Sequence, residues 1–184
     1  MIGVLVSGEG SNLQALLDEG LPVVAVASNR PGVRALGRAA AAGVPSATFE
    51  LGTYPDRAAR DAAIAGWFDE HGVELVVCAG YMHLLEPVFL ERFSGRVVNV
   101  HPAPLPEFPG AHPLEDVLAA GATQAAATVH YVDEGVDTGA VIASEPVPVL
   151  AGDTVETLRE RVHEAEHRLL PAVTRRLLQE RVST

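Results

Sequence analysis

Residues 96–102 read Arg96-Val97-Val98-Asn99-Val100-His101-Pro102, an apolar run that ends in an amide and an imidazole. The valines predict a buried strand, and proline at 102, with more at 104, 106 and 109, ends it. Asn99 and His101 are two residues apart, so their side chains lie on the same side of the strand. Because open α/β sheets carry their chemistry beyond such strand ends, both are candidates for an active site.

The segments around this strand alternate between strand-like and helical patterns. Strands are expected at 2–7, 22–28, 46–50, 74–79, 96–100, 126–132 and 141–146, and helices at 11–19, 32–42, 55–71, 87–93, 113–120 and 153–180. This order predicts an α/β fold, a mostly parallel sheet with helices on both faces. Only a short turn separates the last two strands, which indicates an antiparallel C-terminal extension. Pro171 is expected to bend or divide the last helix.

Composition narrows the classes of function. At 184 residues and 48% apolar, the chain is expected to form a single domain, residues 1–184. Met1 leads directly into a strand and no apolar run nears the roughly 18 residues of a membrane span, so a cytoplasmic protein without membrane contact is expected. The net charge of −11 argues against nucleic-acid partners, and the lack of lysine excludes a Schiff-base mechanism. Cys78, the only cysteine, is predicted to be a buried core residue.

A glycine-rich loop follows the first strand and reads Ser7-Gly8-Glu9-Gly10-Ser11-Asn12. Its glycines let the backbone approach a ligand, and the N–H groups at the helix start attract a phosphate. Leu13 stands where a dinucleotide fingerprint has its third glycine, and no Gly-Lys-Ser marks a Walker loop. A plain tight turn also fits the local pattern.

A carboxylate, Asp137, lies in the turn 133–139 behind the strand predicted at 126–132. Together with Asn99 and His101 it would suit acyl transfer, which needs donors for a developing oxyanion, a proton carrier and a carboxylate that orients it. Taken alone, all three also fit a structural role in loops and turns.

One segment imitates a zinc site. His163-Glu164-Ala165-Glu166-His167 has two histidines one helical turn apart with a glutamate between them, the zincin pattern. The pattern lies near the end of a short chain, and only Glu180 follows as a third ligand. It would also leave the upstream α/β pattern unexplained, so no metal is expected.

Five segments together resemble the glycinamide ribonucleotide formyltransferases, folate-dependent enzymes of purine biosynthesis. They are Ser7–Leu13, Ala79–Met82, Asn99–Pro102, Phe108–His112 and Thr128–Gly139, in the family's order and at its spacings. The resemblance extends to the C-terminal helix and implies a Rossmann-like formyltransferase fold. It implies that a formyl group passes from 10-formyltetrahydrofolate to the amine of glycinamide ribonucleotide, and that the protein is a monomer or a homodimer.

The resemblance also implies roles for individual residues. The catalytic residues would be Asn99, His101 and Asp137, with His112 in a supporting role. The remaining assignments are Gly10, Ser11 and Asn12 for the substrate phosphate, Arg57 and Glu166 for other substrate contacts, and Tyr81, Met82, His83, Leu84 and Leu85 for folate. Departures from the family pattern occur at His83, often arginine in relatives, and at Glu107 and Ala126. His130, within a strand, is expected to be structural.

Three other functions are open. A formyltetrahydrofolate deformylase uses a similar trio, but such enzymes carry an N-terminal regulatory domain and a second histidine where this chain has Pro102. A sugar-nucleotide formyltransferase is disfavoured by the phosphate loop and by Phe108–His112. A catalytically silent folate- or nucleotide-binding module would have no need of the complete trio.

Overall fold

The structure, a computed structural model, describes residues 1–182 and divides into two compact units. The first unit is Met1–Val98 and the second begins at Asn99. Every predicted helix and strand is present, with ends that differ by no more than two residues from the expected ones. The elements are β1 (Ile2–Val6), α1 (Ser11–Asp18), β2 (Val23–Ser28), α2 (Arg34–Ala41), β3 (Ser46–Thr48), the 3-10 turn η1 (Leu51–Thr53), α3 (Arg57–Glu70), β4 (Leu75–Cys78), α4 (Pro87–Arg92), β5 (Val97–His101), α5 (Pro113–Ala119), β6 (Gln124–Tyr131), β7 (Val141–Pro148) and α6 (Val155–Val182).

The sheet is mostly parallel, as predicted. Hydrogen bonds link the strands in the order β3-β2-β1-β4-β5-β6-β7, and β5 spans the boundary between the units. In the first unit β1 is parallel to both β2 and β4, with Val4 beside Val26 and Val77. In the second unit β6 and β7 are antiparallel, which confirms the C-terminal extension.

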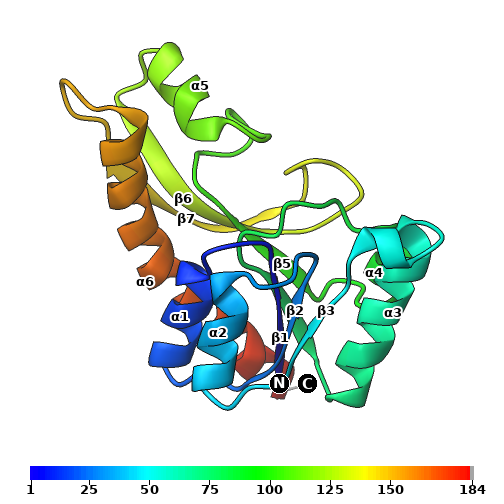
Figure 1. The fold of residues 1–184 in the computed structure, drawn as a ribbon. Helices are drawn as coiled ribbons and strands as arrows, with labels where there is room; N and C mark the ends of the chain where they lie inside the picture. The colour runs from blue at the N-terminus through cyan, green and yellow to red at the C-terminus, as the bar shows by residue number, and fades with distance from the viewer. Residues whose placement is uncertain (183–184) are drawn as a thin grey trace. The chain divides into compact units, whose positions relative to one another are not determined.

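Helices cover both faces of the first unit's strands. All five residues of β1 are buried, as expected for a parallel strand covered on both sides. Figure 1 shows α1 and α2 on one side of β1 and β2, with α3 and α4 on the other. Aromatic rings join α3 to α4, since the Phe68 ring lies 6.3 Å from both Phe89 and Phe93. Cys78 is buried, as predicted, and burial raises the pKa of its thiol to about 12.

The second unit has its own apolar core between the β6–β7 pair and the helices α5 and α6. Side chains alternate across β6, so that Ala125 and Ala127 face this core. They pack with small and branched side chains of α5 and α6, namely Leu114, Val117, Leu158, Val162 and Ala165.

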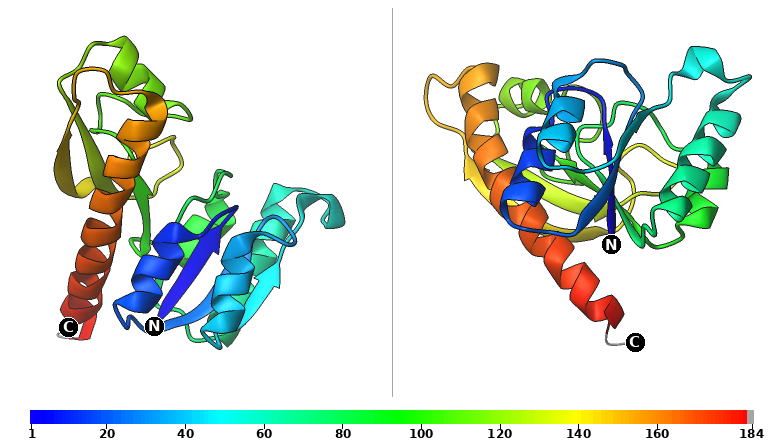
Figure 2. Two further views of the ribbon diagram at one scale, coloured as in Figure 1. Left: turned by 60° about the vertical axis from the view of Figure 1, so that its left-hand side comes forward. Right: turned by 60° about the horizontal axis from the view of Figure 1, so that its bottom comes forward.

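Pro171 does not divide the last helix, because α6 is one helix from Val155 to Val182 with Pro171 inside it. Figure 2 shows α6 as one unbroken helix. Its apolar face is buried on both sides of the proline, at Ala165 before it and Val173 after it. This burial outweighs the roughly 3 kcal/mol that an interior proline costs. Reciprocal hydrogen bonds cap the start of the helix: Thr154 Oγ1 accepts the Thr157 N–H at 3.3 Å, and Thr157 Oγ1 accepts the Thr154 N–H at 3.0 Å. Within residues 1–182 each helix is too short or too polar to cross a membrane.

Candidate active site

The second unit brings the predicted catalytic trio together. Asn99 and His101 lie on β5, and Asp137 lies in the turn between β6 and β7. His101 Nδ1 is 3.4 Å from Asp137 Oδ2, and the His101 side chain is nearly fully buried. A carboxylate at this distance stabilises the imidazolium and fixes the orientation of the ring.

The turn holds Asp137 in an unusual backbone conformation. Its φ of 53° makes it the one non-glycine residue with a positive φ among residues 1–182, a conformation that Asp tolerates better than most side chains. Asp133 braces the turn by accepting hydrogen bonds from Gly135 N–H at 3.0 Å and Thr138 Oγ1 at 2.6 Å. Asp137 Oδ2 accepts the Gly110 N–H at 2.9 Å. The turn 133–139 and the proline-rich loop that follows β5 (residues 102–112) therefore both fix the position of the Asp137 carboxylate.

The electrostatics of Asp137 favour its charged form. Partial burial by itself would raise its pKa. Hydrogen bonding to His130 and to Gly110 N–H, and the charges on His101 and His130, together outweigh burial, so the pKa of Asp137 lies below its ordinary value. The group is thus an anion at neutral pH.

A second histidine belongs to this cluster. His130 Nε2 lies 3.1 Å from Asn99 Nδ2 and 3.4 Å from Asp137 Oδ1, while its Nδ1 is 2.8 Å from Tyr131 O. In the neutral ring Nδ1–H donates to the carbonyl and Nε2 accepts from Asn99; in the imidazolium Nε2–H donates to Asp137. The sequence predicts a structural His130 and gives no sign of these contacts, since only strand pairing places β6 beside β5.

The proline-rich loop contacts the other edge of His101. His101 Nε2 is 2.7 Å from Phe108 O, so this nitrogen carries a proton and donates to the carbonyl. His112 is exposed directly before α5, and in the described part of the chain no hydrogen bond or ion pair joins it to the trio. Its supporting role stays a prediction.

In the first unit the glycine-rich loop is held by α2. Gly10 has a φ of 73°, and a Cβ there would lie 2.6 Å from Ala35 Cβ. Arg38 Nε donates to Glu9 O at 2.9 Å, and Ala35 N–H donates to Gly8 O at 3.1 Å. Ser11 and Asn12 begin α1, so their N–H groups belong to the first turn, where anions are favoured.

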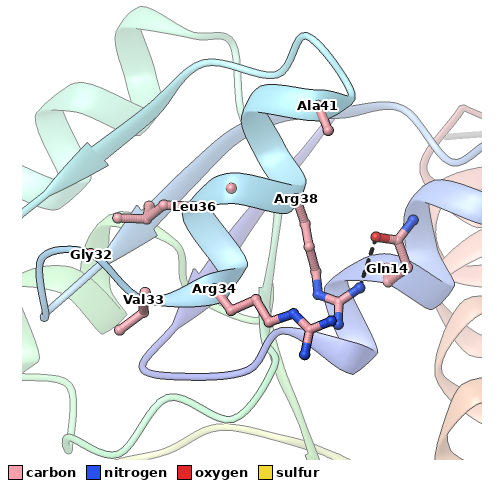
Figure 3. A pocket seen from close by; sticks show the side chains of 8 residues that line it. Gln14, Gly32, Val33, Arg34, Leu36, Arg38 and Ala41 are labelled. Carbon is pink, nitrogen blue, oxygen red and sulfur yellow. Dashed lines mark hydrogen bonds between the residues drawn. The ribbon is translucent and has the colours of Figure 1, made fainter.

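A pocket of about 540 Å³ adjoins this loop, lined by Gln14 and by residues 32–34, 36–38 and 41. Figure 3 shows Arg34 and Arg38 directed toward the α1 side of the pocket, with Arg38 bonded to Gln14. Both arginines also pair with Glu9, at 2.7 and 3.1 Å. The charges of Arg34 and Arg38 therefore pair with Glu9 and help to hold the glycine-rich loop in place.

The loop Tyr81–Leu85, predicted to bind folate, offers an apolar surface. Met82 is 69% and Leu84 46% exposed, whereas Tyr81 and Leu85 are buried and anchor the loop. Ser7 Oγ accepts the Met82 N–H at 2.9 Å. Exposed apolar side chains on an anchored backbone suit a flat ring system.

Two predicted binding residues lie on or against this loop. Arg57, at the start of α3, donates to Leu84 O at 3.2 Å and pairs with Glu86 at 3.3 Å. His83 Nδ1 is bonded to Arg60, and burial together with the nearby guanidinium charges lowers its pKa. The lowered pKa leaves His83 mostly uncharged at neutral pH, whereas the family resemblance predicts a basic residue, often arginine, at this position.

The zincin-like segment lies within α6. His163 and His167 stack with ring centroids 6.2 Å apart, and Glu166 Oε2, on a buried side chain, is 3.9 Å from His163 Nε2. Across residues 1–182 no three histidine, cysteine or acidic side chains form a group suited to a metal ion.

Comparisons with known proteins agree on one family. A family model described as formyl transferase matches residues 1–174. Phosphoribosylglycinamide formyltransferase from Mycobacterium tuberculosis is 50% identical over 174 residues, which cover 92% of this chain and 80% of that protein. The trifunctional purine biosynthetic protein adenosine-3 of Drosophila pseudoobscura pseudoobscura is 45% identical over 92% of this chain, which spans only 13% of that protein. The crystal structure of phosphoribosylglycinamide formyltransferase from Streptococcus pneumoniae is 46% identical, with a TM-score of 0.92 over 96% of this chain and 98% of that one.

Proposed function

Because the chain belongs to the formyl transferase family, we propose that it transfers the formyl group of 10-formyltetrahydrofolate to the amine of glycinamide ribonucleotide in purine biosynthesis. The products are formylglycinamide ribonucleotide and tetrahydrofolate. The observation that carries the proposal is the cluster of Asn99, His101 and Asp137 in one partly buried site. Such a cluster suits acyl transfer without a metal ion or a covalent intermediate on the protein.

The chemistry requires charge stabilisation at two atoms. Attack of the amine on the formyl carbon gives a tetrahedral intermediate with a negative oxygen and a positive nitrogen. An amide has two N–H donors, and Asn99 uses one toward His130, so the second can donate to the oxygen. The imidazolium of His101 supplies the second donor once its Nε2–H exchanges Phe108 O for the substrate oxygen.

Asp137 has the supporting part in this scheme. Its negative charge beside His101 favours the imidazolium and keeps the ring in place. It also orients a water that carries the amine proton to N10 of the folate, so that collapse of the intermediate breaks the bond between the formyl carbon and N10 and releases tetrahydrofolate. Loss of any one of the three side chains is expected to lower kcat by about 10²- to 10⁴-fold.

The first unit supplies binding groups. We assign the substrate phosphate to the loop at Gly10, Ser11 and Asn12, and the folate ring to residues 81–85, where Met82 and Leu84 are exposed. Arg57 and Glu166 are assigned to further substrate contacts. We further propose that the protein acts on small-molecule substrates in the cytoplasm, has no nucleic-acid partner and is a monomer or a homodimer.

A spectrophotometric assay tests this function. Purified protein is mixed with 10-formyl-5,8-dideazafolate, a stable analogue of the donor, with and without glycinamide ribonucleotide. Deformylation that requires the ribonucleotide supports the transferase. Release of formate without the ribonucleotide would identify a deformylase, and binding without any turnover would identify a silent module.

A further inference from the structure

A buried ion pair lies beneath the loop predicted to bind folate. The Arg60 side chain is 0% exposed, and its Nε and Nη2 lie 2.8 and 2.7 Å from Asp61 Oδ1. Asp61 is equally buried. Burying two charges carries a large desolvation cost, so a buried ion pair of this kind is weak evidence for a gain in stability. Its role is therefore sought in the segments that the two side chains contact.

The pair reaches the loop at two points. Arg60 Nη1 is hydrogen-bonded to His83 Nδ1 in the middle of the loop, and Asp61 Oδ2 accepts the Glu86 N–H at 2.8 Å where the loop ends. Ser7 holds the start of the loop through the Met82 N–H at 2.9 Å. The exposed Met82 and Leu84 side chains are thus carried on backbone that is fixed before, between and after them.

The bond between Arg60 and His83 requires a neutral imidazole. A guanidinium has only donors, so His83 Nδ1 must offer its lone pair. Burial and the charges of Arg60, Arg57 and Arg30 lower the pKa of His83, and only Asp61 acts in the opposite sense. The Tyr81 ring, 5.9 Å from the His83 ring, is the remaining titratable neighbour that contacts it, and burial raises the pKa of Tyr81.

We infer that Arg60 is a positioning residue, which acts through His83 to hold the loop Tyr81–Leu85 in the conformation that receives the folate donor. The inference rests on the proposed function for its ligand, but the contacts that carry it lie within the first unit alone. Protonation of His83 would replace the hydrogen bond by repulsion between two cations. The donor should therefore bind most tightly above the pKa of His83, where the imidazole is neutral, and its affinity should fall as the pH is lowered through that pKa.

The first experiment measures donor KM, kcat and the KM for glycinamide ribonucleotide in Arg60→Met. Loss of a buried charged donor is expected to raise the donor KM by about tenfold or more, with the other two parameters changed less than about threefold. Arg60→Met with Asp61→Asn guards against misfolding, since it leaves no unpaired buried charge and keeps an acceptor for Glu86 N–H. The matched control is Arg92→Met, which removes an exposed arginine of α4 that pairs with Asp69 of α3.

A pH series distinguishes positioning from a merely structural role. In the unaltered chain the donor KM should stay constant from pH 7.5 to 6.5 and rise as the pH is lowered further, because the pKa of His83 lies below its ordinary value of 6.5. In His83→Gln it should stay constant, because the Gln oxygen accepts from Arg60 at every pH. In His83→Leu, which has no acceptor for Arg60, the donor KM should be raised at every pH. An unaltered chain with a constant donor KM would contradict the inference.

Amide exchange gives a readout that does not depend on activity. Exchange across residues 81–86 should accelerate in Arg60→Met and in the double variant but not in Arg92→Met. If the unaltered chain transfers formyl groups while Arg60→Met matches it in donor KM and in exchange, the inference is wrong and the proposed function stands. If the unaltered chain neither binds nor deformylates the donor analogue, the proposed function fails, and with it the ligand named here.

Discussion

Gly139→Ala should disable the protein by displacing Asp137, although residue 139 has no chemistry of its own. A Cβ on Gly139 would lie 1.8 Å from Tyr131 O, whereas real Cβ atoms essentially never come within about 3.0 Å of another atom. The backbone must therefore move by about 1.2 Å, the difference between 1.8 and 3.0 Å. Asp137 is two residues away and depends on a 2.9 Å bond from Gly110 N–H, which a shift of that size breaks.

The expected cost falls mainly on kcat. A displacement of roughly 1 Å in a catalytic group lowers the rate by about 100-fold. Strain at the turn should lower the free energy of unfolding by about 1–3 kcal/mol, measured by urea denaturation. The dideazafolate assay gives kcat at saturating concentrations of both substrates.

Gly66→Ala is the matched control. Gly66 is exposed within α3 and a Cβ there meets no atom within 4 Å. The alanine should stabilise the chain by about 0.5–1 kcal/mol and leave kcat unchanged. A folded Gly139→Ala protein that keeps kcat within about threefold of the unaltered chain would refute the reasoning, because it would show that the position of Asp137 does not limit the reaction.

Three other substitutions test separate parts of the structure. Asp137→Asn should lower kcat by about 10²- to 10⁴-fold. The melting temperature should change little, since Asn also tolerates a positive φ, and a large fall in melting temperature would contradict this. Gly10→Ala should raise the KM for glycinamide ribonucleotide more than the KM for the donor, because a Cβ at residue 10 would lie 2.6 Å from Ala35 Cβ and displace the glycine-rich loop. Equal effects on both KM values would count against the assignment of this loop to the substrate phosphate. Phe89→Ala should lower the free energy of unfolding, measured by urea denaturation, by about 3–5 kcal/mol. A decrease below about 1 kcal/mol would show that the aromatic contacts between α3 and α4 contribute little to stability.

The proposed catalytic trio and its surroundings differ in how far the sequence could predict them. Asn99 and His101 share one strand and are two residues apart, so their common side follows from strand geometry alone. The approach of Asp137 to His101 was expected only through the family resemblance, since they are 36 positions apart. His130 shows the limit of sequence-based prediction. Its contact with Asn99 depends on the pairing of β6 with β5, and its contact with Asp137 depends on the turn to β7, against which the register of β6 is shifted between Val129 and His130.

The sequence by itself determined the order of helices and strands, the parallel sheet and its antiparallel extension, because these follow from apolar periodicity and turn residues among neighbours in the chain. Only the tertiary structure decided that α6 continues through Pro171 and that Arg60, buried with Asp61, bonds to His83. The physical reason is the same in both cases. A proline in a helix or a charge in the interior is unfavourable locally, and only the packing and hydrogen bonds made by distant parts of the chain offset the cost.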